Sequence, residues 1–508
     1  MDETSGKRAQ RLNIAPAVVT LYALLGLLGL ARHAMWRDEF NTWLIVRDSQ
    51  SLGDMLSQVH YQGHTALWAL LVAAVSQVVQ RPWIMQGLHW AIAVAATAIF
   101  WRFSPFTARQ KILFTFGYLP FYQYFLVSRP YVLGTACLFG ICALFPRRHR
   151  GYWPLALLLA LLANSHAYGL LVSLALALTL ALEWGCDRTL RQQHGKTAPA
   201  WDIYLSVALV IAGVAAAVYI LSPPANSTNH GGVSAWMLSF DLRHLLRATG
   251  RIFAGHFLVI PTHKRWLDLI VANLIAAGLV ASTVVYLRRR PWALLFYSSA
   301  NAIVLSFTYA RFLGLGQRHF GQFYLILIAA LWLGSCYPAA PGKRAVERSV
   351  ARRYGWCLGL VLWVQCIGGI GAYATSLAIP LSASRAASDY IVSQGWQQEF
   401  MVASRDATMA PISGYLNRQL YYPERQTMGS FTLFNTDRQD VTHGEVLAQT
   451  QRLLTTATGP ERILLVLSAP LAAETQVPLG LVIEPLRQFE KSWQENYYLY
   501  WAKLSSNS

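Results

Sequence analysis

The chain has 508 residues, a formal net charge of +18, and a composition that is 55% hydrophobic and only 13% charged. Long apolar runs recur from residue 16 to about residue 380, which excludes an ordinary soluble protein because no soluble core buries so many of them. Backbone polar groups in lipid must be satisfied within their own segment, so these runs are expected to be helices. They do not alternate with period two, as the strands of a transmembrane barrel would.

Excess Lys and Arg in a membrane chain is first a topology signal, and no zinc-finger spacing or basic-aromatic groove predicts a nucleic-acid partner. The cysteines lie in or beside apolar segments and form no CxxC, so we expect neither a disulfide framework nor a cysteine metal site. The first apolar run is long and is followed by an arginine and two carboxylates, so it is not expected to be a cleavable signal.

Residues 1–15 are expected in the cytoplasm, because they carry a cluster of cations: Lys7, Arg8 and Arg11. The first crossing, at about 16–35, then delivers Asp38 and Glu39 to the outside. These carboxylates open a polar external loop at 36–63.

A short amphipathic helix is predicted within this loop. Ser51 to Asp54 resembles a capping box, and the following apolar residues have helical spacing: Leu52, Met55, Leu56 and Val59. We expect this helix to lie on the membrane surface.

Three apolar stretches follow, at about 64–79, 83–101 and 112–127. If all three crossed the membrane, the basic clusters near Arg109 and Arg148 would both lie outside, against the usual placement of cations. The stretch at 64–79 is the shortest and has a polar end, so we expect it to be partial or re-entrant.

The remaining stretches are expected to cross alternately, at about 131–145, 152–166, 169–185, 203–221, 266–287, 291–310, 319–337 and 355–379. Basic clusters then fall inside: Arg147, Arg148 and Arg150; Arg188, Arg191 and Lys196; Arg288 to Arg290; and Lys343, Arg344, Arg348, Arg352 and Arg353. The total is about eleven crossings. This polytopic domain covers 16–380, with a second external loop at 222–265.

The composition changes at about residue 381, and 381–508 is predicted to be an extracytoplasmic soluble α/β domain. Short apolar runs at 400–403, 463–467 and 497–501 are expected to be strands, and 408–417 and 442–454 helices. The domain contains no Gly-rich phosphate loop and no Ser-His-Asp or metal signature.

Polar side chains from distant segments are expected to meet on the external face: Asp38, Glu39, His64, Arg129, Tyr131, His166, Arg311, Arg318 and His319. Transfer from a phosphate-activated donor needs such a set, because a carboxylate removes the proton of the acceptor hydroxyl and cations stabilise the departing phosphate. The membrane setting favours a lipid-linked donor.

In the second loop Arg243, Arg247 and Arg251 share one helical face, which can hold the donor phosphate or anionic headgroups.

The order of these motifs resembles the GT-C superfamily of integral-membrane glycosyltransferases, in its protein O-mannosyltransferase and aminoarabinose transferase branch. Asp38-Glu39 matches an Asp-Glu pair after the first transmembrane helix, and Gly63-His64-Thr65-Ala66-Leu67-Trp68 is similar to a Gly-His-Pro-Pro-Leu-Tyr run. Val127-Ser128-Arg129-Pro130-Tyr131 and Asn164-Ser165-His166-Ala167-Tyr168 are similar to two further motifs. The likeness covers roughly residues 16–340.

The resemblance implies a polyprenyl-phosphate sugar donor and an inverting transfer without metal or other cofactor, with Asp38 as general base and Glu39 as its orienting partner. The acceptor would be an envelope glycan, a glycolipid or a protein. Two departures stand out. Thr65-Ala66 replaces the prolines after His64, and no second acidic residue lies near Arg129, which argues against a divalent metal site.

These features predict a multi-pass enzyme of the bacterial cytoplasmic membrane, in contact with membrane lipids. Ordinary structural roles stay open for the same side chains, as solvated boundary charges, helix caps or headgroup contacts. A lipid-carrier transporter or flippase would show ionisable residues at mid-membrane and internal repeats, and neither is evident. A non-enzymatic membrane scaffold and a polymerase using lipid-linked oligosaccharide remain alternatives. Asn226-Ser227-Thr228 is a glycosylation sequon of a kind that is common by chance.

Overall fold

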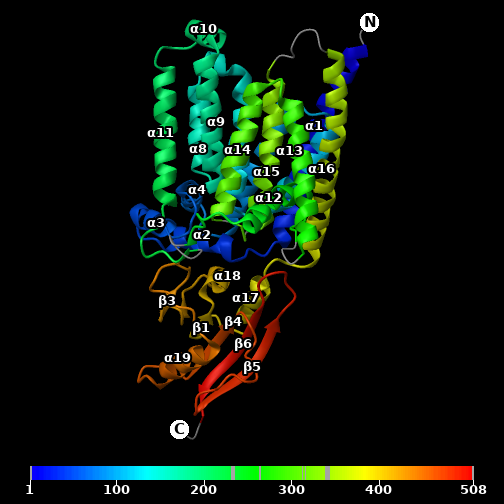
Figure 1. Ribbon diagram of the computed structural model, residues 1–508. Helices are drawn as coiled ribbons and strands as arrows, with labels where there is room; N and C mark the ends of the chain where they lie inside the picture. Colours follow the sequence, from blue (N-terminus) through cyan, green and yellow to red (C-terminus); the bar gives the residue numbers. More distant parts are fainter. Residues whose placement is uncertain are drawn as a thin grey trace.

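The computed structural model describes residues 3–229, 235–261, 265–311, 313–314, 316–337 and 344–505. It is an elongated molecule in which a bundle of helices stands on a smaller α/β domain formed by the C-terminal part of the chain (Figure 1). α10 (Arg188–Thr197) lies at the far end of the bundle, where α1 begins, and the short helices α2 (Arg37–Asp48) and α3 (Leu52–Val59) lie at the end that meets the α/β domain.

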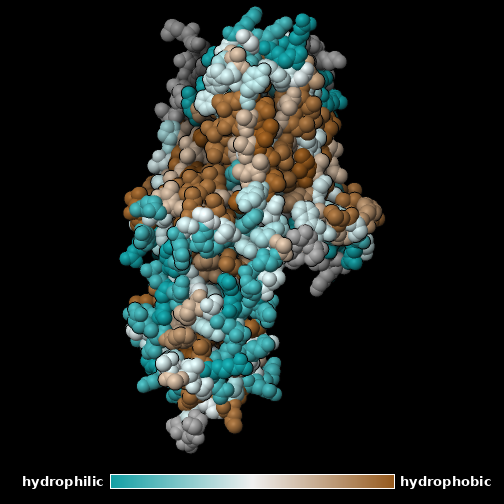
Figure 2. All heavy atoms as spheres, turned by 90° about the vertical axis from the view of Figure 1, so that its left-hand side faces the viewer, coloured by the Kyte–Doolittle hydropathy of each residue, from teal (hydrophilic) through white to brown (hydrophobic). Residues whose placement is uncertain are grey.

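Seven helices of the described residues are long and apolar enough to cross a membrane: Ile14–Arg32 within α1 (Glu3–Arg32), α5 (Trp83–Phe103), α9 (Ala167–Cys186), α11 (Asp202–Leu221), α13 (Trp266–Leu287), α14 (Pro291–Ala310) and Ser349–Ala378 within α16 (Arg344–Ala378). On the face seen in Figure 2, apolar side chains form a band across the bundle, whereas hydrophilic atoms cover its end and much of the α/β domain. A multi-pass helical membrane protein is thus confirmed, whereas the total of about eleven crossings stays a prediction.

Two of the segments are too short to span a bilayer core of about 30 Å. α4 (Ala66–Ser76) and α8 (Trp153–Ala163) each have 11 residues, which extends about 17 Å at the helical rise. The residues next to them meet, since the Thr65 hydroxyl donates to the Asn164 carbonyl oxygen at 2.5 Å. The helix within 64–79 is thus as short as the predicted partial segment requires, whereas its place in the membrane stays a prediction. α8 ends sooner than the expected segment at 152–166.

The stretch at 112–127, expected to be one helix, is broken, and that expectation was wrong. α6 (Ala108–Thr115) stops, and the chain continues as a π-helical turn, η1 (Tyr118–Gln123). The break is possible because α16 presents Gly369 to it: a Cβ there would lie 2.3 Å from the Phe116 carbonyl oxygen. Wide turns of this kind often occur beside functional sites.

The remaining helices of the bundle are α7 (Tyr131–Leu144), the 3₁₀ turn η2 (Phe145–Arg150), α12 (Leu242–Phe257) and α15 (Gln317–Ser335). The basic residues of η2 and α10 share one end of the bundle, because the Thr197 hydroxyl donates to the His149 carbonyl oxygen at 2.6 Å. This agrees with the predicted topology. Some of the predicted topology signals lie outside the described residues: Lys343 and the side chains of Lys7, Arg8, Arg11, Arg344 and Arg348.

The C-terminal domain is built on one six-stranded sheet with the order β3-β2-β1-β4-β6-β5. β1 is parallel to β2 and β4, and the other neighbours are antiparallel. The strands are β1 (Met401–Ser404), β2 (Leu420–Tyr422), β3 (Thr427–Gly429), β4 (Arg462–Leu467), β5 (Leu481–Phe489) and β6 (Tyr497–Leu504). The helices are α17 (Ser384–Ser393), α18 (Asp406–Leu416) and α19 (His443–Thr455). All five predicted elements are found, and β2, β3, β5 and α17 are additional.

The C-terminal domain is fixed to the bundle through α2. A Cβ at Gly414 of α18 would lie 2.1 Å from the Phe40 ring, so only glycine lets the two helices approach this closely. The Tyr415 ring packs edge-on against Phe40 at 4.7 Å between centroids, and its hydroxyl accepts the Met35 backbone N–H at 3.0 Å. The segment that carries Asp38 is therefore held between both parts of the molecule.

Candidate active site

A polar cavity of about 480 Å³ lies where the bundle meets the C-terminal domain. Seven of the predicted side chains line it: Asp38, His64, Arg129, Tyr131, His166, Arg318 and His319. They come from α2, the segments before α4 and α7, the beginning of α9 and the first turn of α15. The short helix α4 begins beside the cavity, directly after Gly63 and His64, and α8 ends shortly before His166.

Asp38 and Glu39 lie in the first turn of α2, where the helix dipole favours negative charge. Their side chains have different environments. Asp38 faces the cavity with 26% of its side chain exposed, whereas the Glu39 side chain is fully buried. Glu39 accepts hydrogen bonds from the Ser128 backbone N–H at 2.7 Å and the Trp36 backbone N–H at 3.2 Å, and pairs with His33 at 2.8 Å. Glu39 therefore positions the chain around the cavity and does not line it.

Arg129 joins two cavity groups with one planar guanidinium. Its Nη1 forms an ion pair with Asp38 Oδ2, and its Nη2 donates to His64 Nε2 at 2.7 Å. Arg318 Nη2 approaches the same Asp38 oxygen at 3.4 Å. The arrangement is a carboxylate flanked by two arginines, which is also the chemistry that holds a phosphate.

The charges around Asp38 control its protonation. Burial raises the pKa of the Asp38 carboxyl, but Arg129, Arg318, Arg37 and His64 outweigh this and lower it to about 2. Burial and the neighbouring Arg129 lower the pKa of His64 well below its ordinary value. Asp38 is therefore ionised and His64 neutral at physiological pH, which agrees with His64 Nε2 acting as an acceptor.

A second group of rings lines the inner wall. The Tyr131 hydroxyl and His319 Nε2 are hydrogen-bonded at 2.8 Å, and the Tyr131 ring lies 4.8 Å from the His166 ring. His166 also caps α9, since its Nδ1 accepts the Gly169 backbone N–H at 3.0 Å. His166 therefore has both roles that the sequence left open: it caps a helix, and it lines the cavity.

The cavity also contains three members of the quoted motifs that were not predicted as site residues, Gly63, Ala167 and Tyr168. Its other lining residues were not indicated by the sequence: Arg37, Asn41, Thr42, Gln62, Asn229, Ala407, Thr432 and Phe434. Three of these belong to the C-terminal domain, which therefore forms one wall. The Thr432 backbone N–H donates to Asn41 Oδ1 at 2.9 Å, and Gln62 Nε2 donates to the Thr432 carbonyl oxygen at 3.0 Å. The only sequence signal that Gln62 would line the cavity is its position directly before the Gly63-His64 motif.

The structure does not bring Arg247 to this cavity. It lies on α12, which packs against α13 and α15. Arg251 on the same helix is 5% exposed and stacks 4.9 Å from the Phe320 ring. Arg311 reaches the rim, where its Nη2 donates to the Asn229 carbonyl oxygen at 3.0 Å.

Among the residues that the structure describes, no group of three or more His, Cys, Asp or Glu side chains is arranged to share a metal ion. The cations that face Asp38 are arginines, which cannot ligate a metal. A transfer without metal stays a prediction.

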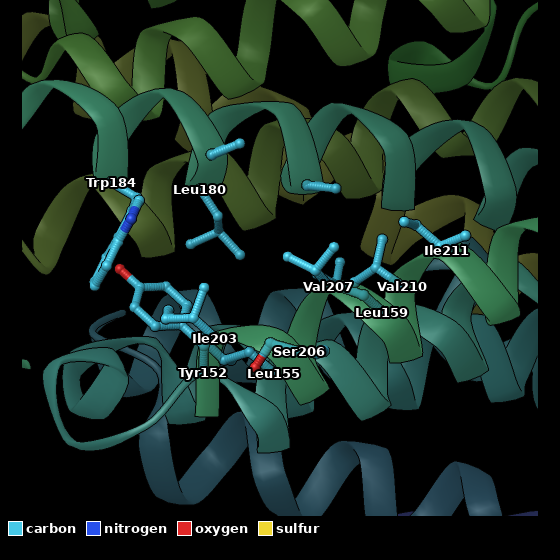
Figure 3. A pocket seen from close by; sticks show the side chains of 13 residues that line it. Tyr152, Leu155, Leu159, Leu180, Trp184, Ile203, Ser206, Val207, Val210 and Ile211 are labelled. Atoms are coloured by element: carbon cyan, nitrogen blue, oxygen red, sulfur yellow. The ribbon is translucent and has the colours of Figure 1, made fainter. Parts of the chain in front are cut away.

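A separate cavity of about 290 Å³ lies between α8, α9 and α11 (Figure 3). Tyr152 and Trp184 lie toward one end, and aliphatic side chains such as Leu159 and Val210 line the rest. A mostly apolar lining of this kind suits hydrocarbon, and it contains no charged side chain to bind a sugar phosphate. The Asp38 cavity is therefore the better candidate for chemistry.

No protein-family model and no curated protein matches the sequence. The structure is similar to the crystal structure of ArnT from Cupriavidus metallidurans bound to undecaprenyl phosphate, with a TM-score of 0.50 and 12% sequence identity over 99% of each chain. The chain has a fold of this GT-C type, which confirms the fold that the sequence motifs indicated. At this identity the similarity concerns the fold alone.

Proposed function

We propose that this protein is a membrane glycosyltransferase that moves a sugar from a polyprenyl-phosphate carrier to an acceptor hydroxyl in the Asp38 cavity. The observation that carries the proposal is the placement of Asp38 between Arg129 and Arg318, in a polar cavity of an otherwise apolar bundle. Support also comes from the GT-C type fold and from the undecaprenyl phosphate bound to the similar ArnT structure.

In the proposed reaction the acceptor oxygen attacks the anomeric carbon of the donor sugar. The bond from that carbon to the phosphate oxygen breaks, and the phosphate leaves with the electron pair. Arg129 and Arg318 stabilise its charge, and Asp38 takes the proton of the attacking hydroxyl. A single displacement of this kind inverts the anomeric configuration.

Asp38 with a pKa of about 2 is a weak base while both arginines pair with it. A donor phosphate carries charge that competes for the same guanidinium groups. We therefore infer that donor binding weakens the contacts of Asp38 with Arg129 and Arg318 and raises its basicity before transfer. The acceptor hydroxyl becomes more acidic as its bond to carbon forms, so that a modest base suffices.

The site would face the outer leaflet of the bacterial cytoplasmic membrane, with the N-terminus inside and the C-terminal domain outside. An envelope glycan, a glycolipid or a protein would then reach Asp38 between α2 and the C-terminal wall. A cytoplasmic reporter fused after residue 505 should be inactive in cells if this orientation is correct.

The test is sugar transfer in proteoliposomes, with a series of radiolabelled polyprenyl-phosphate sugars and membrane-envelope extract as acceptor. We expect the wild type to consume one donor in the presence of chelator, and Asp38→Asn, inserted and folded normally, to lose more than 10²-fold in rate. Full activity of Asp38→Asn contradicts the role of the base. Movement of the carrier lipid without loss of label from it would support a transporter instead.

A further inference from the structure

A second polar cavity, of about 380 Å³, opens at the same end of the molecule between α2, α3 and the β2–β3 hairpin. It contains three glutamines, two aspartates and an arginine, together with the half-buried ring of Phe431. None of these residues lines the Asp38 cavity. The function proposed above does not use this second cavity.

Several polar side chains of this cavity are unused in the described part of the chain. The side chains of Gln50, Gln419 and Arg425 make no hydrogen bond or ion pair there. Gln58 donates to Asp54 Oδ1 at 2.8 Å, which leaves its own buried Oε1 without a partner. The amide and guanidinium groups of Gln50, Gln419 and Arg425 thus offer free donors and acceptors to the cavity, whereas Gln58 Oε1 has no accessible surface in this arrangement.

The balance of charge indicates what the cavity can bind. Asp48 is neutralised by Arg47, at 2.5 Å between Nε and Oδ1, and also accepts the Ser430 hydroxyl. Asp54 and Arg425 then offset each other, so the cavity has no excess positive charge to hold a phosphate. Its polar lining equally disfavours a lipid chain.

Sugar hydroxyl groups both donate and accept hydrogen bonds, as amide side chains do, and their ring faces pack on aromatic rings. The geometry points to a carbohydrate-binding subsite, which holds a sugar residue of an acceptor glycan remote from the residue that reacts. This inference rests on the proposed function only in identifying the bound saccharide as part of the acceptor substrate. Binding of a saccharide here needs no transfer.

The two cavities share a wall. Phe431 faces the second cavity, whereas the next residue, Thr432, faces the Asp38 cavity. Asp38 and Asp48, one in each lining, are ten positions apart on α2, about 15 Å along the helix axis. A glycan that occupies both cavities would therefore extend over the Ser430–Thr432 segment with more than one sugar residue.

The experiment uses the full chain in lipid nanodiscs and an array of immobilised neutral and anionic oligosaccharides. The neutral oligosaccharide that binds best is then titrated in solution by saturation-transfer NMR. We expect the double variant Gln419→Ala/Arg425→Ala to weaken its Kd at least tenfold. Arg452→Ala, an exposed arginine on α19, is the matched control and should leave the Kd unchanged.

Asp38→Asn should still bind the oligosaccharide through the second cavity, so that the further loss on adding Gln419→Ala/Arg425→Ala is at least tenfold in this background too, although its transfer is more than 10²-fold slower. The inference is overturned if no oligosaccharide binds the wild type, if the double variant binds equally well, or if inorganic phosphate displaces the ligand. A wild type that transfers sugar but binds no oligosaccharide refutes the subsite alone. A wild type that binds oligosaccharide through Arg425 and consumes no donor refutes the proposed transfer alone. Unchanged thermal unfolding of the double variant shows that its fold is intact.

Discussion

Arg129 and Asp38 form an ion pair that joins the segment before α7 to the first turn of α2. The residues beside them form a second link, since Glu39 accepts the Ser128 backbone N–H at 2.7 Å. Two consecutive acids thus hold two consecutive residues of a distant segment. The Arg129–Asp38 link faces the cavity, whereas the Ser128–Glu39 link is buried. Breaking each link should therefore have a different effect.

The open link predicts that Arg129→Lys impairs turnover although it keeps the charge. The guanidinium contacts Asp38 with one nitrogen and His64 with another, whereas a lysine ammonium is a single point. We expect kcat to fall about 10- to 100-fold, with a smaller change in KM for the donor. The same substitution at exposed Arg452 should have no effect. An unchanged kcat would mean that simultaneous contact of the guanidinium with Asp38 and His64 is not needed for turnover.

The buried link predicts that Glu39→Gln destabilises the fold. Each carboxylate oxygen accepts a backbone N–H, from Ser128 or Trp36, and the amide NH₂ of glutamine must face one of these donors. One unsatisfied buried donor costs about 1–3 kcal/mol. Thermal unfolding in nanodiscs should show a clearly lower Tm than for Glu461→Gln, which is exposed. Equal Tm values for the two variants would contradict a positioning role.

Local signals in the sequence were sufficient for most of the apolar helices and for seven of the residues that line the cavity. Asp38 and Glu39 follow the first apolar run directly, and a change from apolar to polar residues is visible without tertiary structure. The helix α2 was not predicted, although the sequence contains a signal for it. Phe40, Trp43 and Leu44 have the i, i+3, i+4 spacing of a buried helical face.

Other features depend on contacts between distant segments. The break at η1 requires Gly369, which lies on α16, and no local pattern connects the two. Thr432 and Phe434 reach the cavity because the C-terminal domain docks on α2. Arg247 shares a helical face with Arg251, but the packing of α12 keeps it away from Asp38, and spacing alone does not predict packing partners.

The docking contact predicts that Gly414→Ala separates the C-terminal domain from α2. The added methyl would overlap the Phe40 ring, which is fully buried and cannot move aside easily. Overpacking of this kind costs about 1–3 kcal/mol. We expect faster cleavage between the domains in limited proteolysis and loss of transfer. Gly444→Ala on α19, whose Cβ would meet only the Thr442 hydroxyl at an ordinary contact distance of 4.0 Å, should behave as wild type. Protection equal to the wild type would show that this contact does not hold the domain.

Glu495 of the C-terminal domain lies beneath Arg37, the neighbour of Asp38. Its side chain is fully buried, and its Oε1 accepts the Arg37 backbone N–H at 3.2 Å and lies 3.8 Å from Arg37 Nε. Tyr497 and Ser382 complete its surroundings, with the Tyr497 hydroxyl 3.5 Å from Oε2. Burial raises the pKa of this carboxyl to about 7, although Ser382 and Arg37 partly oppose the shift.

Glu495→Gln is therefore expected to change how the stability of the protein depends on pH. A carboxyl whose pKa is higher in the folded than in the unfolded state binds its proton more tightly when folded. Its contribution to stability is present below its ordinary pKa of 4.5 and is lost as the pH rises through about 7. Glutamine mimics the protonated form, so the Tm of the variant should match the wild type near pH 5 and exceed it at pH 8. Because both proteins contain the same histidines, the Tm difference between the variant and the wild type reports on Glu495 alone. A constant difference across this range would show that Glu495 does not titrate at the domain contact.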